Sequence, residues 1–229
     1  MVNDYYYDEV SSVTFDDIIY DNELQNSIDL ILKEYEHIET LHKYGLPINH
    51  KFLFHGHTGC GKTTTAKAIA NKLNKRLFVV NLGTIVSSKL GETARNINSI
   101  FKKAMREHAI VFFDEFDSLG KIRDYDKDSS EMKRVVNSII QLLDYLPYDC
   151  MVIAATNQIQ MIDEAILRRF EMKLTFKAPE DDLLDIFYKQ LLAKFPEKYH
   201  NIEKQYGVSY AEAKVLSFNQ IKKMIISGL

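Results

Sequence analysis

The order of apolar and polar positions predicts strands and helices in alternation over most of the chain. Short apolar runs typical of buried strands are KFLFHG, RLFVVNL, AIVFFDE, CMVIAATN and MKLTF. Helical patterns stand between them, at 62–73, 94–107 and 132–146. Because consecutive parallel strands need crossover connections, this alternation predicts an α/β fold built on one parallel sheet.

The pattern changes at both ends of the chain. Residues 1–14 show no periodicity, and we expect them to form a flexible arm. After KAPEDD the apolar residues share one helical spacing, at Leu184, Phe187, Leu191 and Phe195. We therefore expect an α/β domain at 15–178, followed by a small helical domain at 179–229.

Composition narrows the class of protein. Of the 229 residues, 46% are hydrophobic and 27% are charged, which is typical of a globular protein. The net charge of −3 provides no overall basic field for nucleic acid or an anionic membrane. Cys60 and Cys150 do not suggest a disulfide framework or a zinc site, and no apolar run is long enough to span a bilayer. We expect a cytoplasmic protein.

One glycine-rich segment predicts a phosphate-binding loop. Gly56–Thr63 fits the pattern G-x-x-x-x-G-K-[ST], and it stands after a strand and at the start of a helix. Glycines let backbone N–H groups surround phosphate oxygens, the helix N-terminus adds partial positive charge, and Lys62 adds a full charge. The hydroxyl of Thr63 is suited to Mg²⁺. The alternative is a glycine turn that only caps an ordinary helix.

Two strand ends carry polar residues that complement this loop. Asp114 and Glu115 follow IVFF, and Asn157 follows IAAT. At the carboxyl edge of a parallel sheet, Asp114 can hold Mg²⁺ through water and Glu115 can deprotonate an attacking water. The amide of Asn157 can bind both the γ-phosphate and that water. The alternatives are acids that simply end a strand and an asparagine that belongs to a turn.

A pair of arginines stands where a short helical pattern passes into the last strand. On their own, Arg168 and Arg169 fit a solvated surface. In an oligomer, an arginine can instead stabilise the transferring phosphate on a neighbouring subunit. Their role therefore depends on assembly.

These motifs, in this order, resemble the AAA family of ATPases within the AAA+ group. The phosphate loop is similar to its Walker A motif, IVFFDE to Walker B, AATN to sensor 1 and IDEAILRRF to the second region of homology. TFDDIIYDNEL resembles the segment that covers adenine, and YGVSYAEA the start of the lid helix. The resemblance implies a five-stranded parallel P-loop NTPase domain with helices on both faces, followed by a small helical lid.

The resemblance also implies roles for single residues. Catalytic roles fall to Glu115, Asn157, Arg168 and Arg169. The positions that would bind ATP are Ile18, Ile19, Gly56, His57, Thr58, Gly59, Cys60, Gly61, Lys62, Thr63, Thr64, Asp114 and Ala211. Mg²⁺ would be held by Thr63 and Asp114.

By the same resemblance, the active form is a homo-oligomer, commonly a hexameric ring or spiral, with ATP at the subunit interfaces. We expect an ATP-hydrolysing motor that remodels, unfolds or disassembles a protein substrate, brought by a separate adaptor or effector. The alternative is an ATP-controlled switch or assembly scaffold with slow hydrolysis. A third candidate, a DNA-remodelling ATPase, is disfavoured because the chain lacks a basic field.

Two segments depart from the family pattern. Lys89 and Leu90 occupy the place of the aromatic–aliphatic pair that grips a peptide in the pore, and the second pore loop falls at the polar stretch 123–130. Because lysine lacks a flat ring, threading of a substrate does not follow from the resemblance.

In the phosphate loop, Cys60 gives a redox hypothesis, since a thiol at a helix N-terminus can have a lowered pKa. The alternative is a small residue that fills space.

Overall fold

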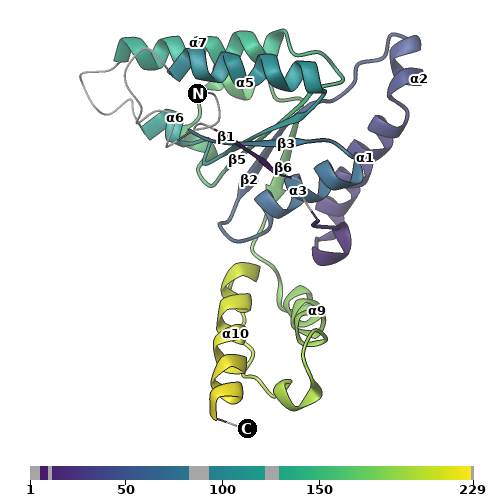
Figure 1. Cartoon of the computed structure of the whole chain (residues 1–229), viewed down its shortest axis with the longest axis vertical. Helices are drawn as coiled ribbons and strands as arrows, with labels where there is room; N and C mark the ends of the chain where they lie inside the picture. Colours follow the sequence, from purple (N-terminus) through teal and green to yellow (C-terminus); the bar gives the residue numbers. More distant parts are fainter. Residues whose placement is uncertain (1–5, 10–11, 83–92, 122–128, 228–229) are drawn as a thin grey trace.

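The chain forms one central sheet in the part that the computed structural model describes, namely residues 6–9, 12–82, 93–121 and 129–227. The sheet has six strands in these ranges, in the order β1-β3-β4-β5-β2-β6 (Figure 1). They are β1 (Tyr6–Glu9), β2 (Lys51–Gly56), β3 (Leu77–Asn81), β4 (Ile110–Asp114), β5 (Met151–Thr156) and β6 (Met172–Phe176). Neighbours among β2 to β6 pair in parallel, which confirms the predicted α/β class.

Helices cover both faces of the sheet. The helices are α1 (Asn22–Glu36), α2 (Ile38–Lys43), α3 (Lys62–Lys72), α5 (Thr93–Glu107), α6 (Ser118–Lys121), α7 (Ser129–Asp144), α8 (Glu164–Leu167), α9 (Asp181–Leu192) and α10 (Tyr210–Ser227). In Figure 1, α5 and α7 lie over one face, and α1 and α3 over the other. Because alternate residues of a strand point to opposite faces, Leu53 of β2 packs with α5 and α7, whereas Phe52 and Phe54 pack with α1 and α3.

The sixth strand corrects two expectations. β1 pairs antiparallel with β3, so the sheet has six strands instead of five, and Tyr6–Glu9 is not part of a flexible arm. Tyr6 is buried, and its ring centroid lies 4.9 Å from that of Phe78. A four-residue strand with two acids is too short to show a periodicity, and its place is fixed by this burial and by the edge of β3.

The C-terminal helices α9 and α10 pack on each other and lie below the sheet in Figure 1. Leu184 and Tyr188 of α9 share a small core with Ala213 of α10. The Tyr188 hydroxyl donates to the carbonyl of Gln205 at 2.7 Å, which fixes the connection between the two helices. The helical pattern predicted after KAPEDD is confirmed, and the domain boundary at 179 stays a prediction.

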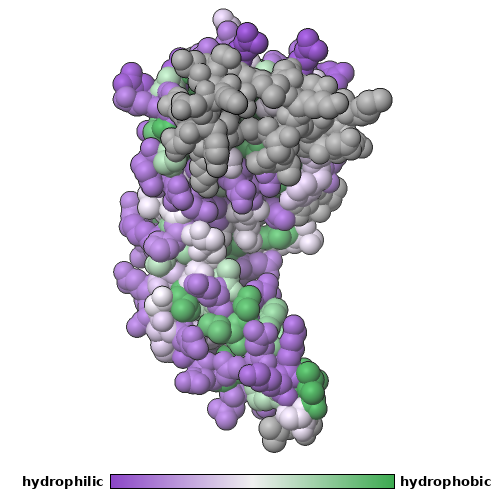
Figure 2. All heavy atoms as spheres, turned by 90° about the vertical axis from the view of Figure 1, so that its left-hand side faces the viewer, coloured by the Kyte–Doolittle hydropathy of each residue, from purple (hydrophilic) through white to green (hydrophobic). Residues whose placement is uncertain are grey.

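Apolar side chains also gather on the outside of this helical part, on the face drawn in Figure 2. The large apolar residues of α10 that are exposed are Val215, Ile225 and Ile226. These apolar positions do not make α10 a membrane segment: across the described ranges, no helix is both long and apolar enough to cross a bilayer.

Candidate functional site

The phosphate loop leaves β2 through a glycine that no other residue can replace without a clash. Gly56 has φ +128°, and a Cβ atom there would lie 2.1 Å from the backbone oxygen of Phe176 in β6. The N–H of His57 donates to the same oxygen at 2.9 Å. The loop therefore begins in direct contact with the neighbouring strand.

Lys62, the first residue of α3, carries its charge into the loop. Its side chain is 8% exposed, and Nζ donates to the carbonyls of Gly56 at 2.8 Å and His57 at 2.7 Å. Burial lowers the pKa of this ammonium group, and the carboxylates of Asp114 and Asp117 act in the opposite direction. The loop thus holds a buried cation beside the backbone N–H groups at the N-terminus of α3.

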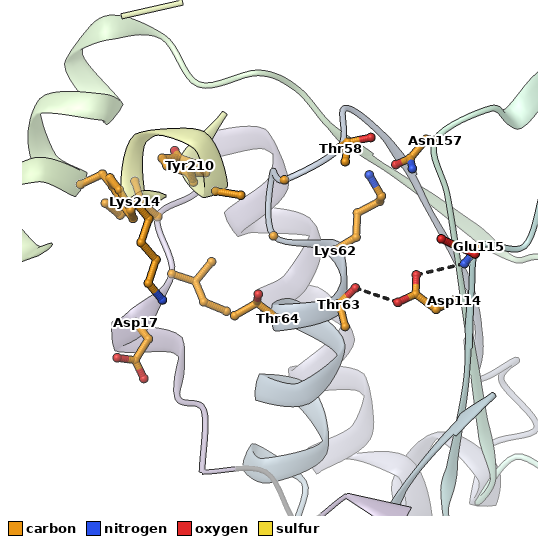
Figure 3. Close-up of a pocket in the computed structure, with 16 residues that line it drawn as sticks. Asp17, Thr58, Lys62, Thr63, Thr64, Asp114, Glu115, Asn157, Tyr210 and Lys214 are labelled. Atoms are coloured by element: carbon orange, nitrogen blue, oxygen red, sulfur yellow. Dashed lines mark hydrogen bonds between the residues drawn. The ribbon is translucent and has the colours of Figure 1, made fainter. Parts of the chain in front are cut away.

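Across the loop from this lysine, a hydroxyl and a carboxylate converge. Thr63 Oγ1 donates to Asp114 Oδ2 at 3.3 Å, and the N–H of Glu115 donates to Asp114 Oδ1 at 3.0 Å (Figure 3). Mg²⁺ binds through oxygen ligands and takes one or two from the protein beside substrate phosphates and water. Thr63 and Asp114 fit such an ion.

Glu115 adopts a backbone conformation that is uncommon for a residue with a side chain. Its φ is +50°, in the left-handed region, directly after the last residue of β4. The exposed carboxyl group faces the cavity together with Asn157, which follows β5 (Figure 3). An acid and an amide thus stand at the carboxyl ends of two adjacent parallel strands.

These residues surround a cavity of about 470 Å³. The predicted ATP-binding and catalytic residues that line it are Ile18, Ile19, Thr58, Gly59, Gly61, Lys62, Thr63, Thr64, Asp114, Glu115, Asn157 and Ala211. The structure therefore brings together residues from the N-terminal segment, three strand ends and α10.

Sequence reasoning missed four further lining residues, which are Asp17, Phe187, Tyr210 and Lys214. Tyr210 adjoins the predicted Ala211, and Lys214 follows Tyr210 by one helical turn, so helical spacing could have suggested both. Figure 3 shows Lys214 extending from α10 toward Asp17. Burial raises the pKa of the Tyr210 hydroxyl, a group that is already neutral near pH 7 at its ordinary pKa.

Direct contacts join α10 and the N-terminal segment to the phosphate loop. The N–H of Ala211 donates to the carbonyl of Gly59 at 3.1 Å. A Cβ atom on Gly59 would lie 2.7 Å from Ser209 Oγ, so the loop and the start of α10 touch closely. On the other side, the hydroxyls of Tyr20 and Thr65 lie 2.9 Å apart, which ties the N-terminal segment to α3.

Three predicted loop residues are described but do not line the cavity: Gly56, His57 and Cys60. The Cys60 side chain is 5% exposed and packs in the core beside α3, and burial raises the pKa of its thiol. The redox hypothesis rested on a lowered pKa, and the raised pKa removes that premise, while oxidation of Cys60 itself stays a hypothesis. The alternative, a small residue that fills space, agrees with this burial.

Both predicted arginines lie outside the cavity of their own chain and are paired with acids. Arg168 is exposed and bonds to Glu164 in the preceding helical turn. Arg169 contacts Asp144 with Nε at 3.2 Å and donates to the carbonyl of Ala165 at 2.8 Å. Of the expected pore residues, Lys89, Leu90 and 123–128 lie outside the described residues.

The family assignment follows from this fold and site together with the comparison of sequences. Residues 52–178 match the ATPase family associated with various cellular activities (AAA), which is more than half of the chain. The chain belongs to this family of AAA+ ATPases, whose members bind nucleotide.

Individual relatives differ in what their names describe. The chain is 38% identical over 199 residues to an uncharacterized AAA family ATPase of Sinorhizobium fredii, which covers 86% of this chain and 60% of that protein. It is 32% identical over 222 residues to a proteasome-associated ATPase of Rhodococcus erythropolis, covering 85% and 37%. It is 34% identical over 185 residues to a peroxisomal ATPase of Saccharomyces cerevisiae, covering 76% and 18%. The chain thus spans less than two thirds of each of these relatives.

Proposed function

We propose that this chain hydrolyses ATP with Mg²⁺ at the described cavity. The observation that carries the proposal is the convergence of Lys62, Thr63, Asp114, Glu115 and Asn157 on one space at the carboxyl edge of the sheet. A helix cap needs none of the last three residues, so the alternative of a simple glycine turn does not account for them.

The chemistry assigns a different task to each polar group. Lys62 would exchange its contacts to the Gly56 and His57 carbonyls for phosphate oxygens, while the loop N–H groups bind the same phosphates. Thr63 and Asp114 would hold Mg²⁺, which neutralises charge on the phosphates when it is bound. Glu115 would accept a proton from the attacking water, and Asn157 would orient that water.

The two arginines lead to a proposal about assembly. Arg168 is exposed and lies outside the cavity of its own chain. Its side chain is therefore accessible to a neighbouring subunit but does not contact the nucleotide site of its own chain. We place ATP at an interface of a homo-oligomer, with Arg168 or Arg169 reaching the phosphates of the adjacent subunit. A hexamer is the form that the family resemblance implies.

The function that this arrangement supports best is an AAA+ motor that remodels, unfolds or disassembles a protein substrate. Support comes from relatives named as a proteasome-associated ATPase and a peroxisomal ATPase. A separate adaptor or effector would bring the substrate. The second candidate is a switch or scaffold that binds ATP and hydrolyses it slowly. Both arginines are paired with acids of their own chain, which favours slow hydrolysis in a chain that has not assembled.

Mixing variants tests hydrolysis and assembly in one experiment. ATP turnover is measured for the wild type, Glu115→Gln, Arg168→Ala and Arg169→Ala, alone and in mixtures, with Arg106→Ala on α5 as the exposed control. If Arg168 or Arg169 acts on the neighbouring subunit, its alanine variant should lose about 10³-fold in turnover while it still binds ATP. Mixed with Glu115→Gln, it should regain activity, because some interfaces then combine an intact glutamate with an intact arginine.

Two outcomes would contradict the proposal. A mixture no more active than its separate components would exclude an arginine that acts on a neighbour. A wild type that binds ATP tightly without turnover would favour the switch or scaffold.

A further inference from the structure

Two buried polar side chains lie outside the cavity lining and have no role in the hydrolysis proposed above. Asp117 is 4% exposed and Thr156 is 1% exposed, and neither of these described residues lines the cavity. Thr156 is the last residue of β5, directly before Asn157, and Asp117 follows Glu115 by two positions. Each therefore lies within two positions of a residue proposed for hydrolysis.

The hydroxyl of Thr156 makes two hydrogen bonds that fix the chain around Asn157. Thr156 Oγ1 donates to Asp117 Oδ1 at 3.0 Å and accepts from the N–H of Gln158, also at 3.0 Å. A hydroxyl has one donor proton and can accept as well, so this one is used in both directions. Because the second bond spans Asn157, it sets the turn from which the amide side chain projects.

Glu115 is also held by contacts to the end of β5. The left-handed φ of +50° at this residue persists only where the surrounding structure fixes it. The N–H of Phe116 donates to the carbonyl of Ala155 at 2.8 Å, and the Phe116 side chain is fully buried. With Asp117 bonded to Thr156, two consecutive residues after Glu115 are attached to the last two residues of β5.

We infer that Thr156 and Asp117 are positioning residues, which hold Glu115 and Asn157 in the relation that hydrolysis requires. The inference rests on the proposed function, because it assigns the pair a task in that reaction. A buried carboxylate that loses this hydroxyl donor loses the bond that attaches it to β5, where water cannot easily replace the donor. The loops after β4 and β5 would then be free to separate, and the catalytic acid and amide would lose alignment.

Thr156→Val tests this inference, because valine keeps the shape and removes both hydrogen bonds. We expect kcat for ATP to fall about tenfold to a hundredfold, as misplacement of catalytic groups does, with the affinity for ATP changed less than about twofold. Thr156→Ser, which keeps the hydroxyl, should retain kcat within about threefold of the wild type. The matched control is Thr175→Val in β6, an exposed threonine whose hydroxyl lies 3.2 Å from His55 Nε2.

A double variant separates positioning from a general loss of structure. Because Asn157→Ala removes the amide, no alignment of Glu115 with Asn157 is left to lose, and Thr156→Val should then lower kcat by no more than about twofold. An undiminished loss in that background, or an equal loss in Thr156→Ser, would overturn the inference. Thermal unfolding of each variant identifies any that fails to fold.

A second measurement needs no ATP turnover at all. Amide hydrogen exchange should become faster at 156–158 in Thr156→Val and remain at the wild-type rate in Thr175→Val. Unchanged exchange at 156–158 would overturn the inference even in an active enzyme. Absent turnover in the wild type would instead contradict the proposed function. Faster exchange in Thr156→Val would still show that the buried pair holds the loops after β4 and β5 together.

Discussion

The two ends of the cavity are built on different supports. The phosphate end consists of Gly59, Gly61, Lys62 and Thr63 with Asp114, and it is backed by strands whose side chains are almost fully buried. The helical end consists of Asp17–Ile19, Tyr210, Ala211 and Lys214. Ala211 and Lys214 are exposed, and Ile18 and Ile19 are half-buried.

This difference suggests that the two ends contribute differently to nucleotide binding. At the phosphate end, the backbone is supported by the sheet and α3, so binding of phosphates requires little rearrangement beyond the Lys62 side chain. At the helical end, α10 contacts the loop through few bonds, among them that from Ala211 to Gly59. We expect changes at the first end to alter affinity strongly and changes at the second to alter it moderately.

The largest expected effect comes from removing the buried cation at the phosphate end. Lys62→Ala should weaken ATP binding about thirtyfold or more, since truncating a buried, hydrogen-bonded charge costs about 2–5 kcal/mol. Calorimetric titration with ATP measures the loss. Lys72→Ala, an exposed lysine at the end of the same helix, is the control and should bind as the wild type does.

An intermediate effect is expected where the two ends meet. In Gly59→Ala, the new Cβ would lie 2.7 Å from Ser209 Oγ and 2.9 Å from the Ala211 Cβ, so α10 must move away from the loop. We expect about tenfold weaker ATP binding, about 1.4 kcal/mol. Gly45→Ala provides the control, because Gly45 has a similar φ of +67° and nothing within 4 Å of the new atom.

The outcome of that pair decides whether the two ends are coupled. If both variants lose the same stability in denaturant unfolding and bind ATP equally, the contact between Gly59 and α10 contributes nothing to affinity. A loss of affinity confined to Gly59→Ala would show that the helical end works through the loop.

The smallest effect is expected at Cys60, whose side chain lies in the core behind the phosphate end. Burial raises the pKa of the thiol, so the reactive thiolate is present only above the ordinary range of cysteine and is scarce near pH 7. Cys60→Ser and the wild type should therefore lose ATPase activity at the same rate in peroxide, within about twofold. Faster inactivation of the wild type would mean that the core opens at this end.

The sequence predicts the phosphate end far better than the helical end, for a physical reason. Loop residues from Gly56 to Thr63 are contiguous, and the chemistry of phosphate binding restricts the residue type at the fixed positions of the pattern and the spacing between them. Tyr210 and Lys214 reach the cavity only because α10 folds back onto Gly59, and that contact depends on the packing of α9 against α10. Helical spacing from Ala211 points to both residues, but no local pattern in the chain contains the contact between α10 and Gly59.

The sequence pattern also does not predict the backbone conformation and buried hydrogen bonds around the catalytic residues. A pair of acids after a strand predicts a ligand at Asp114 and a base at Glu115, but it does not predict the left-handed φ at Glu115. Nor does it predict that Thr156 and Asp117 would be joined by a buried hydrogen bond. Such features depend on contacts between β4 and β5, which only the folded sheet brings together.

The short strand β1 has a practical consequence for anyone who trims or tags this protein. It covers the backbone edge of β3, whose residues Leu77–Val80 have side chains that are almost fully buried. A shortened variant that starts at residue 12 would leave that edge unpaired, and an open, apolar edge is a template for intermolecular strand pairing. Such a variant should precipitate during purification even with every nucleotide-binding residue intact, so an affinity tag is better attached ahead of β1 than in its place.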